Sequence, residues 1–361
     1  MDKPQIIAFY LPQYHPTPNN DKWWGKGFTE WTNVGKAKPL FKGHYQPKVP
    51  ADLGYYDLRL PEVREEQVRL AKEAGVNAFC YYHYWFGNGR QELELPFNEI
   101  LKSGKPDFPF CLCWANESWH SKFWNLDGTI EKKTLVEQIY GNESEWEKHF
   151  NYLLPAFKDS RYYKINGKPL FMIYREHEFN NVKEFIKYWN NLALKNGLKG
   201  IYFIAQIAEN ISYENVKYIK TKGFDAINTV GLWKPMNLKP TIIQRIKRKL
   251  GFKLPYVKEY SNIYPNFISS VDSEENVFPT LIPNWDHSPR SGKAGYILMN
   301  STPELFGKHV DHVFDIVKSK NNKLVFLKSW NEWGEGNYME PDLKYGKGYI
   351  NILRSKLKKD E

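Results

Sequence analysis

The sequence predicts a (β/α)8 TIM barrel with long inserted βα loops, and three observations support this fold class. Eight short apolar runs follow one another along the 361 residues. Each run is continuously apolar, as in strands buried on both faces of a parallel sheet. Helix-like segments or long polar loops separate the runs. A doubly wound open sheet is the alternative, but no G-x-G-x-x-G follows the first run, which disfavours its nucleotide-binding form.

The eight expected strands are defined by their sequences. All are rich in aromatic and β-branched residues, which favour strands. In chain order they are IIAFYL (6–11), NAFCYYHYW (77–85), FPFCLCWA (108–115), PLFMIY (169–174), GIYFIAQI (200–207), DAINTVG (225–231), FPTLIPNW (278–285) and KLVFLKSW (323–330).

The clearest expected helix covers residues 60–75. Pro61 suits a first helical turn, Glu62 favours the positive N-terminal end, and Gly75 is a plausible stop. We expect further helices near 91–103, 144–158, 181–196, 211–222, 302–319 and 347–359.

Two stretches interrupt this alternation within a single expected domain, residues 1–361. Residues 15–56 are predicted to form a long loop after the first strand. Residues at about 234–276 are predicted to form a basic loop or helix insertion after the sixth strand. From Lys239 to Lys258 this insertion has seven Lys or Arg and no acid. It is interpreted either as an amphipathic helix on an anionic membrane or as a basic lid on the barrel.

The composition favours a carbohydrate ligand. Aromatic residues make up 16% of the chain, and many stand among polar residues, as in DKWWGKGFTEWTN. Flat apolar rings beside hydrogen-bonding groups suit sugars, although aromatic residues also fill large cores. The net charge of +10 is compatible with anionic lipid or acidic glycan; nucleic acid is not the expected partner.

Polar and aromatic residues accumulate where the expected strands end, which is where barrel enzymes carry their active sites. We therefore predict a substrate-binding pocket built from these strand ends and from the loop after the first strand. Its predicted residues are Tyr14, His15, Trp31, His83, Tyr84, Trp114, Asn116, Glu117, Trp119, Tyr174, Arg175, Gln206, Trp285, Asp286, Trp330, Asn331 and Trp333.

The stretch KSWNEWGEGN follows the eighth strand and carries Glu332 and Glu335. Two carboxyl groups held close together disfavour double ionisation, so one of them can act as an acid near neutral pH. Such a pair can cleave or form a glycosidic bond. The alternative is a polar turn that merely carries charge. Glu332 and Glu335 are the predicted catalytic residues.

Other chemistries find little support. The sequence has no Walker A loop, no H-E-x-x-H and no G-x-S-x-G. Neither a metal nor a cofactor is expected. Cys80, Cys111 and Cys113 lie in apolar runs, which fits a reducing compartment. No segment approaches the ~20 apolar residues of a membrane span. We expect a cytoplasmic protein, with peripheral attachment to the inner membrane as a variant.

Several long motifs resemble one family. AFYLPQYHP, NDKWWGKGFTEWTNV, WANESW and SWNEWGEGNYMEPD are similar to the glycoside hydrolase family 99-like proteins. They are closest to the WbsX branch, described as glycosyltransferases of lipopolysaccharide and capsule loci. The resemblance implies a (β/α)8 barrel. It also implies that Glu332 acts as a base on the 2-hydroxyl of the sugar and Glu335 as the general acid/base.

Three functional readings remain open. The first is a retaining glycoside hydrolase or transglycosylase acting on a bacterial surface polysaccharide or its precursor, which makes an oligo- or polysaccharide the expected partner. The second is a WbsX-type glycosyltransferase that builds the glycan from an activated donor, with a lipid-linked glycan as a further candidate partner. The third is a non-catalytic glycan-binding barrel.

Overall fold

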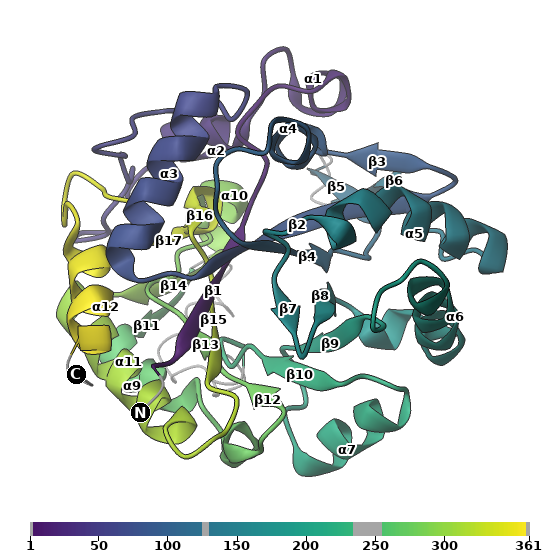
Figure 1. Cartoon of the computed structure of the whole chain (residues 1–361). Helices are drawn as coiled ribbons and strands as arrows, with labels where there is room; N and C mark the ends of the chain where they lie inside the picture. The colour runs from purple at the N-terminus through teal and green to yellow at the C-terminus, as the bar shows by residue number, and fades with distance from the viewer. Residues whose placement is uncertain (1–2, 125–129, 234–254, 359–361) are drawn as a thin grey trace.

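The computed structural model describes residues 3–124, 130–233 and 255–358. Eight strand positions form a closed ring in which every neighbouring pair is parallel, and helices surround it (Figure 1). The predicted barrel and all eight predicted strands are confirmed. The strands are β1 (Gln5–Tyr10), β2 (Ala78–Gly87), β4 (Phe110–Trp114), β8 (Lys168–Ile173), β9 (Tyr202–Ile207), β10 (Ala226–Thr229), the pair β12 (Val277–Phe278) and β13 (Thr280–Leu281), and β15 (Leu324–Leu327).

The seventh position is split at Pro279, which has no N–H to donate to a neighbour. β12 pairs with β10 on one side, and β13 pairs with β15 on the other. The carbonyl of Pro279 accepts a hydrogen bond from the N–H of Phe326 at 3.0 Å. The split segment therefore closes the ring.

The helices follow the expected positions. Helix α3 (Pro61–Ala74) starts with proline in its first turn and ends before Gly75, whose φ of 86° is a left-handed conformation that suits glycine. The other predicted helices appear as α4 (Leu95–Ser103), α5 (Glu143–Lys158), α6 (Val182–Lys195), α7 (Tyr213–Thr221), α11 (Pro303–Val317) and α12 (Gly348–Lys358).

The long loop predicted at 15–56 contains two short helices, α1 (Pro18–Trp24) and α2 (Glu30–Lys36). The hydroxyl oxygen of Thr17 accepts from the N–H of Asn20 at 3.1 Å, and that of Thr29 accepts from the N–H of Trp31 at 3.3 Å. Threonine at the N-cap is a helix-start signal that can be read from sequence. The loop prediction missed it.

Small hairpins decorate the barrel. β3 (Arg90–Glu92) folds back on β2, so the helix expected from residue 91 begins only at Leu95. β5 (Trp119–Trp124) and β6 (Ile130–Val136) form an antiparallel pair after β4. β7 (Lys164–Ile165) folds back on β8 in the same way.

The basic insertion predicted at 234–276 lies largely outside the described residues, since 234–254, including the candidate amphipathic helix, are not described. The rest contains β11 (Tyr256–Glu259), α9 (Tyr260–Ile263) and two short 3-10 turns. β11 pairs in parallel with β14 (Tyr296–Met299), outside the barrel ring.

The core has two layers. Inside the ring, Phe9 stacks on Tyr82 and on Phe326, with ring centroids 5.6 and 5.4 Å apart. Between the ring and the helices lies a second layer of buried apolar and aromatic side chains. The thiols of the three cysteines are free and buried in β2 and β4.

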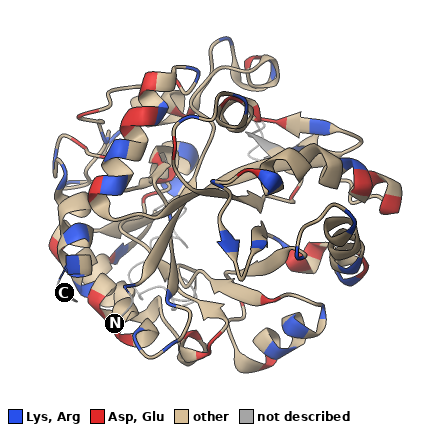
Figure 2. Ribbon diagram, viewed as in Figure 1, with Lys and Arg blue, Asp and Glu red and all other residues tan. Residues whose placement is uncertain are grey.

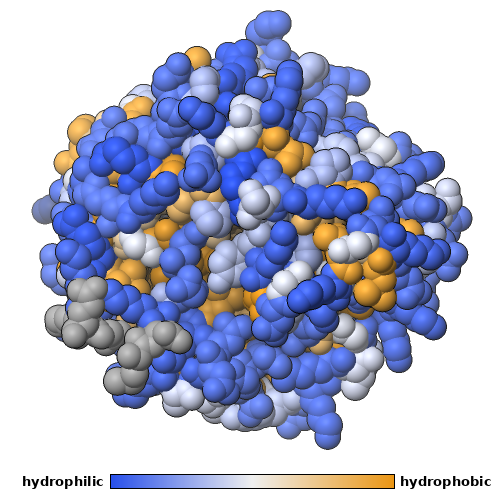
Figure 3. Space-filling view, viewed as in Figure 1, coloured by the Kyte–Doolittle hydropathy of each residue, from blue (hydrophilic) through white to orange (hydrophobic). Residues whose placement is uncertain are grey.

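Charged residues lie mainly on the outer helices and loops, whereas the central strands carry few (Figure 2). Hydrophilic residues cover most of the face shown in Figure 3, with apolar residues visible in patches between them. Among the described residues, no helix has both the length and the apolar character needed to cross a membrane.

Candidate active site

A polar cavity of about 230 Å³ lies at the carboxyl ends of the barrel strands. This cavity, named the reacting cavity after the reaction proposed below, brings together eight of the predicted site residues from six strand ends. They are Tyr84, Glu117, Trp119, Tyr174, Gln206, Trp285, Glu332 and Glu335.

Strand geometry decides which residues reach the reacting cavity. Side chains of a strand point alternately to its two faces. On β2, Tyr82 and Tyr84 line the cavity, whereas His83 and Trp85 pack outward against α5. The same alternation turns Trp114 outward and leaves Ala115 at the cavity wall.

The segment after β15 is folded tightly over the barrel mouth. It forms β16 (Asn331–Glu332), a 3-10 turn (Trp333–Glu335) and β17 (Asn337–Tyr338). The Asn331 amide exchanges two hydrogen bonds with the backbone of Leu11, at 2.8 and 3.0 Å. The indole of Trp333 stacks on Tyr338 with centroids 3.8 Å apart. These contacts fix the position of both glutamates.

Glu332 is buried in the wall of the reacting cavity and accepts a hydrogen bond from the Lys328 ammonium at 3.1 Å. Lys328 also donates to the Tyr82 hydroxyl at 3.0 Å. Burial raises the pKa of Glu332 well above its usual range, and the neighbouring Glu335 adds to this effect, while Lys328 opposes it. Glu332 therefore holds a proton at higher pH than an exposed glutamate.

Glu335 is held differently. Its carboxylate accepts a hydrogen bond from Arg290 at 2.5 Å and lies 3.7 Å from the ring of His287. Arg290, on the short helix α10 (Ser288–Ser291), also donates from Nε to Glu30 on α2 at 3.0 Å. A side chain at Gly334 would overlap the Glu30 carboxylate, so glycine there lets this ion-pair chain approach.

The remaining predicted residues lie outside the reacting cavity. On the outer face of the barrel, His83 pairs with His149 at 2.8 Å between their Nε2 atoms, and burial lowers the pKa of His83 to about 3. Trp114 donates from its indole to the carbonyl of Trp85 at 2.9 Å. Trp330 packs on Phe79. These residues belong to the packing layer.

A second group supports the site from behind. Tyr14, Trp31 and Trp333 pack on one another, and the Tyr14 hydroxyl hydrogen-bonds to the carbonyl of Asn331 and the N–H of Trp333. His15 is buried nearby in sequence, and burial lowers its pKa to about 4. Tyr14 and Trp31 hold the loop that carries the two glutamates, and neither they nor His15 line the cavity.

Asn116 and Arg175 connect neighbouring strand ends. The Asn116 side-chain oxygen accepts from the N–H of Arg175 at 2.8 Å. The Arg175 side chain lines an adjoining hollow of about 490 Å³ and pairs with Glu117 at 3.2 Å. This hollow shares Tyr174 and Gln206 with the reacting cavity. The two spaces therefore adjoin.

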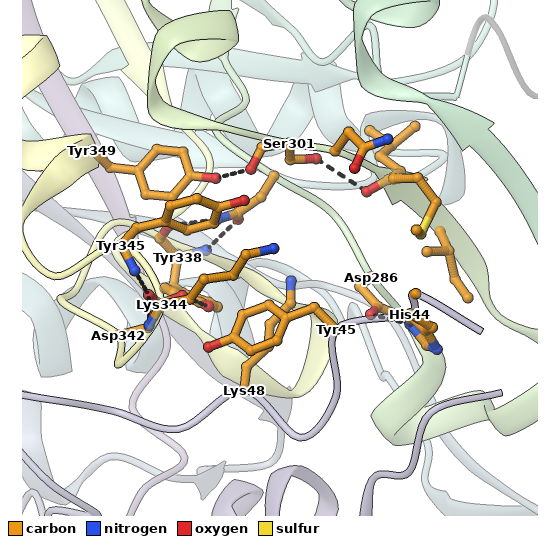
Figure 4. A pocket seen from close by; sticks show the side chains of 16 residues that line it. His44, Tyr45, Lys48, Asp286, Ser301, Tyr338, Asp342, Lys344, Tyr345 and Tyr349 are labelled. Atoms are coloured by element: carbon orange, nitrogen blue, oxygen red, sulfur yellow. Dashed lines mark hydrogen bonds and ion pairs between the residues drawn. The ribbon is translucent and has the colours of Figure 1, made fainter. Parts of the chain in front are cut away.

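Asp286 lines a different pocket, with a smaller cavity of about 50 Å³ (Figure 4). Burial alone would raise its pKa, but His44 and Lys48 outweigh that effect and lower it to about 2. Its carboxylate accepts from His44 at 2.8 Å and from Gln46 at 2.6 Å.

The sequence interpretation missed several cavity residues. Arg290 and Lys328 supply its cations, and Tyr82 and Trp233 add aromatic surface. Lys328 is the first residue of the stretch KSWNEWGEGN, four residues before Glu332. Its position at the end of the eighth predicted strand could have indicated that it lines the cavity. Arg290 follows no pattern that identifies it. Among the described residues, no three His, Cys, Asp or Glu side chains gather closely enough to hold a metal ion.

Comparisons with known proteins agree with this picture. The family model described as Glycosyltransferase WbsX matches residues 6–353. Two curated relatives, both called uncharacterized protein WxcX, come from two strains of Xanthomonas campestris pv. campestris; each is 33% identical over 356 residues. The match covers 98% of this chain and 49% of the relative, so the chain spans about half the length of these proteins.

Solved structures share the fold. An endo-alpha-mannosidase of family GH99 from Bacteroides thetaiotaomicron is 16% identical, with a TM-score of 0.56 and coverage of 99% of this chain and 97% of that one. A glycoside hydrolase-like protein is 14% identical, with a TM-score of 0.61 and coverage of 99% and 94%. These structures share the (β/α)8 barrel of this chain. Because the family model matches nearly the whole chain, we conclude that the chain belongs to the WbsX glycosyltransferase family, a carbohydrate-active family.

Proposed function

We propose that this chain breaks and re-forms glycosidic bonds in the reacting cavity, as a retaining glycoside hydrolase or transglycosylase, with Glu332 and Glu335 as the reacting pair. The observation that carries the proposal is the contrast between the two carboxyl groups. Glu332 is buried with a raised pKa, whereas Glu335 is held by Arg290. The pair thus favours a single shared proton, which is the proton count that acid–base cleavage of a glycoside requires.

The roles of the two glutamates follow the family resemblance. As the sugar enters, the proton passes to Glu335, and Glu332 becomes the base. Glu332 takes the proton of the 2-hydroxyl, O2 attacks the anomeric carbon, and Glu335 gives its proton to the leaving oxygen. In the second half, Glu335 takes a proton from the incoming hydroxyl as that oxygen attacks the anomeric carbon and the bond between O2 and that carbon breaks. Glu332 then returns its proton to O2, which restores both groups.

The surroundings of the pair support a carbohydrate ligand. The walls combine aromatic rings, Tyr84, Trp119 and Trp285, with hydrogen-bonding groups such as Gln206. The adjoining hollow extends the space beyond one sugar's immediate contacts. We therefore infer an oligosaccharide or polysaccharide substrate, of the bacterial surface type that the resemblance implies. Water as the incoming group gives hydrolysis, and a sugar hydroxyl gives transfer.

A second candidate is transfer from a nucleotide-activated sugar, and the description of the family as glycosyltransferases favours it. Such a donor needs groups that hold its phosphates. Arg290 and Lys328 are the cations of the reacting cavity, but each already contacts a glutamate. Because both cations already pair with glutamates, we rank transfer from a nucleotide-activated sugar second.

The test combines product analysis with binding. Wild-type protein, Glu332→Gln and Glu335→Gln are incubated with a bacterial glycan library, and released or transferred products are identified by mass spectrometry. The proposal expects products from wild type alone. Melting temperatures are measured with nucleotide-sugars and with free oligosaccharides, since a ligand that binds the folded state raises the melting temperature. Stabilisation and turnover only with a nucleotide-sugar would replace the proposal with the second candidate.

A further inference from the structure

The pocket that contains Asp286 has a cavity of about 50 Å³. A single water needs roughly 10–15 Å³ of cavity, so the space suits a few waters or one small polar ion. Segments far apart in sequence build it, namely residues 43–48, 284–301 and 338–349. Nothing in the proposed reaction uses this space.

Two lysines line this pocket. Figure 4 shows Lys48 and Lys344 beside Tyr45 in the lining of the same pocket. The Lys344 ammonium lies 4.7 and 4.9 Å from the ring centroids of Tyr45 and Tyr345, and that of Lys48 lies 5.4 Å from the Tyr338 centroid. Lys48 is 8% exposed, whereas Lys344 lies on the exposed rim. Lys48 donates to the carbonyl of Gly336 at 3.2 Å. Among the described residues, no carboxylate oxygen lies within the 4.0 Å ion-pair distance of either ammonium.

The two aspartates of the pocket are engaged by other donors. Asp286 accepts from His44 and Gln46, as described above. Asp342 accepts from the Tyr338 hydroxyl at 2.6 Å and from the N–H of Tyr345 at 2.6 Å. Both carboxylates still attract Lys48 at longer range, yet burial dominates and lowers the pKa of that lysine. The lysines therefore retain hydrogen-bond donors with no carboxylate partner nearby.

A buried ammonium without an ion-pair partner is costly, and proteins usually place a counter-charge beside it. We propose that this pocket binds a small oxyanion of the phosphate type, held between Lys48 and Lys344. Oxygen atoms of the anion would accept hydrogen bonds from the ammonium groups of the two lysines. The negative charge of the anion would offset the cost of burying Lys48. The inference is independent of the proposed function.

Binding there would affect the loop of the proposed catalytic residues. Lys48 holds the carbonyl of Gly336, the residue that follows Glu335, and the N–H of Asp286 donates to the backbone carbonyl of Glu335 at 2.7 Å. Gly336 has φ of 54°, and a Cβ there would stand 2.7 Å from the Lys48 nitrogen. An anion on Lys48 would thus act through a close-packed contact and reduce the freedom of this loop.

The same chemistry has two sources, a free phosphate ion or the phosphomonoester of a sugar. Isothermal titration calorimetry at pH 7.5 and constant ionic strength tests each, with sodium phosphate and with glucose 1-phosphate as probes. The binding proposal expects saturable one-site binding of phosphate. Equal or tighter binding of glucose 1-phosphate identifies an open site for phosphorylated sugars, whereas phosphate alone identifies an ion site.

The variants are Lys48→Met and Lys344→Met, with Lys102→Met as the control, an exposed lysine on α4. Each pocket variant should weaken phosphate affinity at least tenfold, and the control should leave it unchanged. Because Lys344 is exposed, its variant tests the site even where Lys48→Met reduces folding. No saturable binding to wild type, or equal affinity in wild type and Lys344→Met, would overturn the proposal.

Discussion

Two aromatic, titratable regions lie on opposite faces of the same strands, and they have different chemistry. The reacting cavity contains Glu332 and Glu335 next to cations and open space. The outer layer contains His83, His149 and Trp114, whose rings pack on one another between the barrel and α5 and α6. Both regions come from sequence motifs that place polar and aromatic residues together at strand ends.

The difference shows that a residue's place at a strand end does not tell whether its side chain faces the cavity or the outer packing layer. In the cavity, burial and paired charges leave carboxyl groups that can exchange a proton. In the outer layer, burial lowers the pKa of both His83 and His149, and the neighbouring His83 lowers the pKa of His149 further, which keeps both histidines neutral. One region is suited to proton transfer and the other to packing.

The largest expected effect is on activity, from Glu332→Gln. Loss of a positioned acid–base group costs roughly 10²–10⁴-fold in rate, and we expect the upper end because the base also starts the reaction. Stability should stay close to wild type, since the amide fills nearly the same volume. Steady-state kinetics on the identified substrate and urea unfolding measure both. Glu62→Gln, which changes an exposed glutamate on α3, is the control and should retain full activity.

Trp114→Ala tests the other side of the comparison. Removing a buried tryptophan from a packed layer typically costs about 3–5 kcal/mol of unfolding free energy. The catalytic rate of the remaining folded protein should change little, because the side chain does not line the reacting cavity. Urea unfolding and kinetics at low temperature are the measurements. A large fall in rate with unchanged stability would place Trp114 with the reacting pair after all.

Arg290→Gln probes how the cavity holds Glu335. Without the guanidinium, the carboxylate loses its strongest partner and its fixed position, and misplacement of a reacting group by about 1 Å can cost roughly 10²-fold in rate. Arg175→Gln, in the adjoining hollow, is the matched control. The rate and its pH profile are measured together. An Arg290→Gln profile identical to that of wild type would show that the ion pair does not position Glu335.

The smallest expected effect concerns pH and the outer histidines. The pKa of His83 is about 3 in the folded protein and roughly 6.5 in the unfolded chain. Its contribution to stability is therefore full above the unfolded value and is lost as the pH falls toward the folded value. Lowering the pH from 7.5 to 5 therefore reduces the free energy of unfolding by about 2 kcal/mol for one such histidine.

In His83→Gln this pH-dependent loss should shrink by about that amount, because glutamine does not titrate. Urea unfolding at both pH values measures it. His120→Gln is the control, since His120 is exposed. If His83→Gln and wild type lose the same stability between these pH values, protonation of His83 is not coupled to unfolding.

The barrel could be predicted from sequence because its signals are local and repeated. Continuous apolar runs identify strands buried on both faces, and helix-start and helix-stop residues such as Pro61 and Gly75 bound the segments between them. The same reading placed Glu332 and Glu335 after the eighth strand, where barrels carry their chemistry. Local pattern was sufficient for both.

Only the tertiary structure decided which way each side chain faces and which charged residues pair. Strand alternation, applied to β2, could have separated Tyr84 from His83, but which of the two faces is the inner one depends on how the ring closes. Arg290 meets Glu30 and Glu335 across 260 and 45 residues of chain, respectively. Such contacts leave no periodic trace in the sequence, because they arise from where loops from different strands converge. The sequence by itself therefore determined the barrel and the place of Glu332 and Glu335 after its eighth strand, and folding determined which side chains share the cavity.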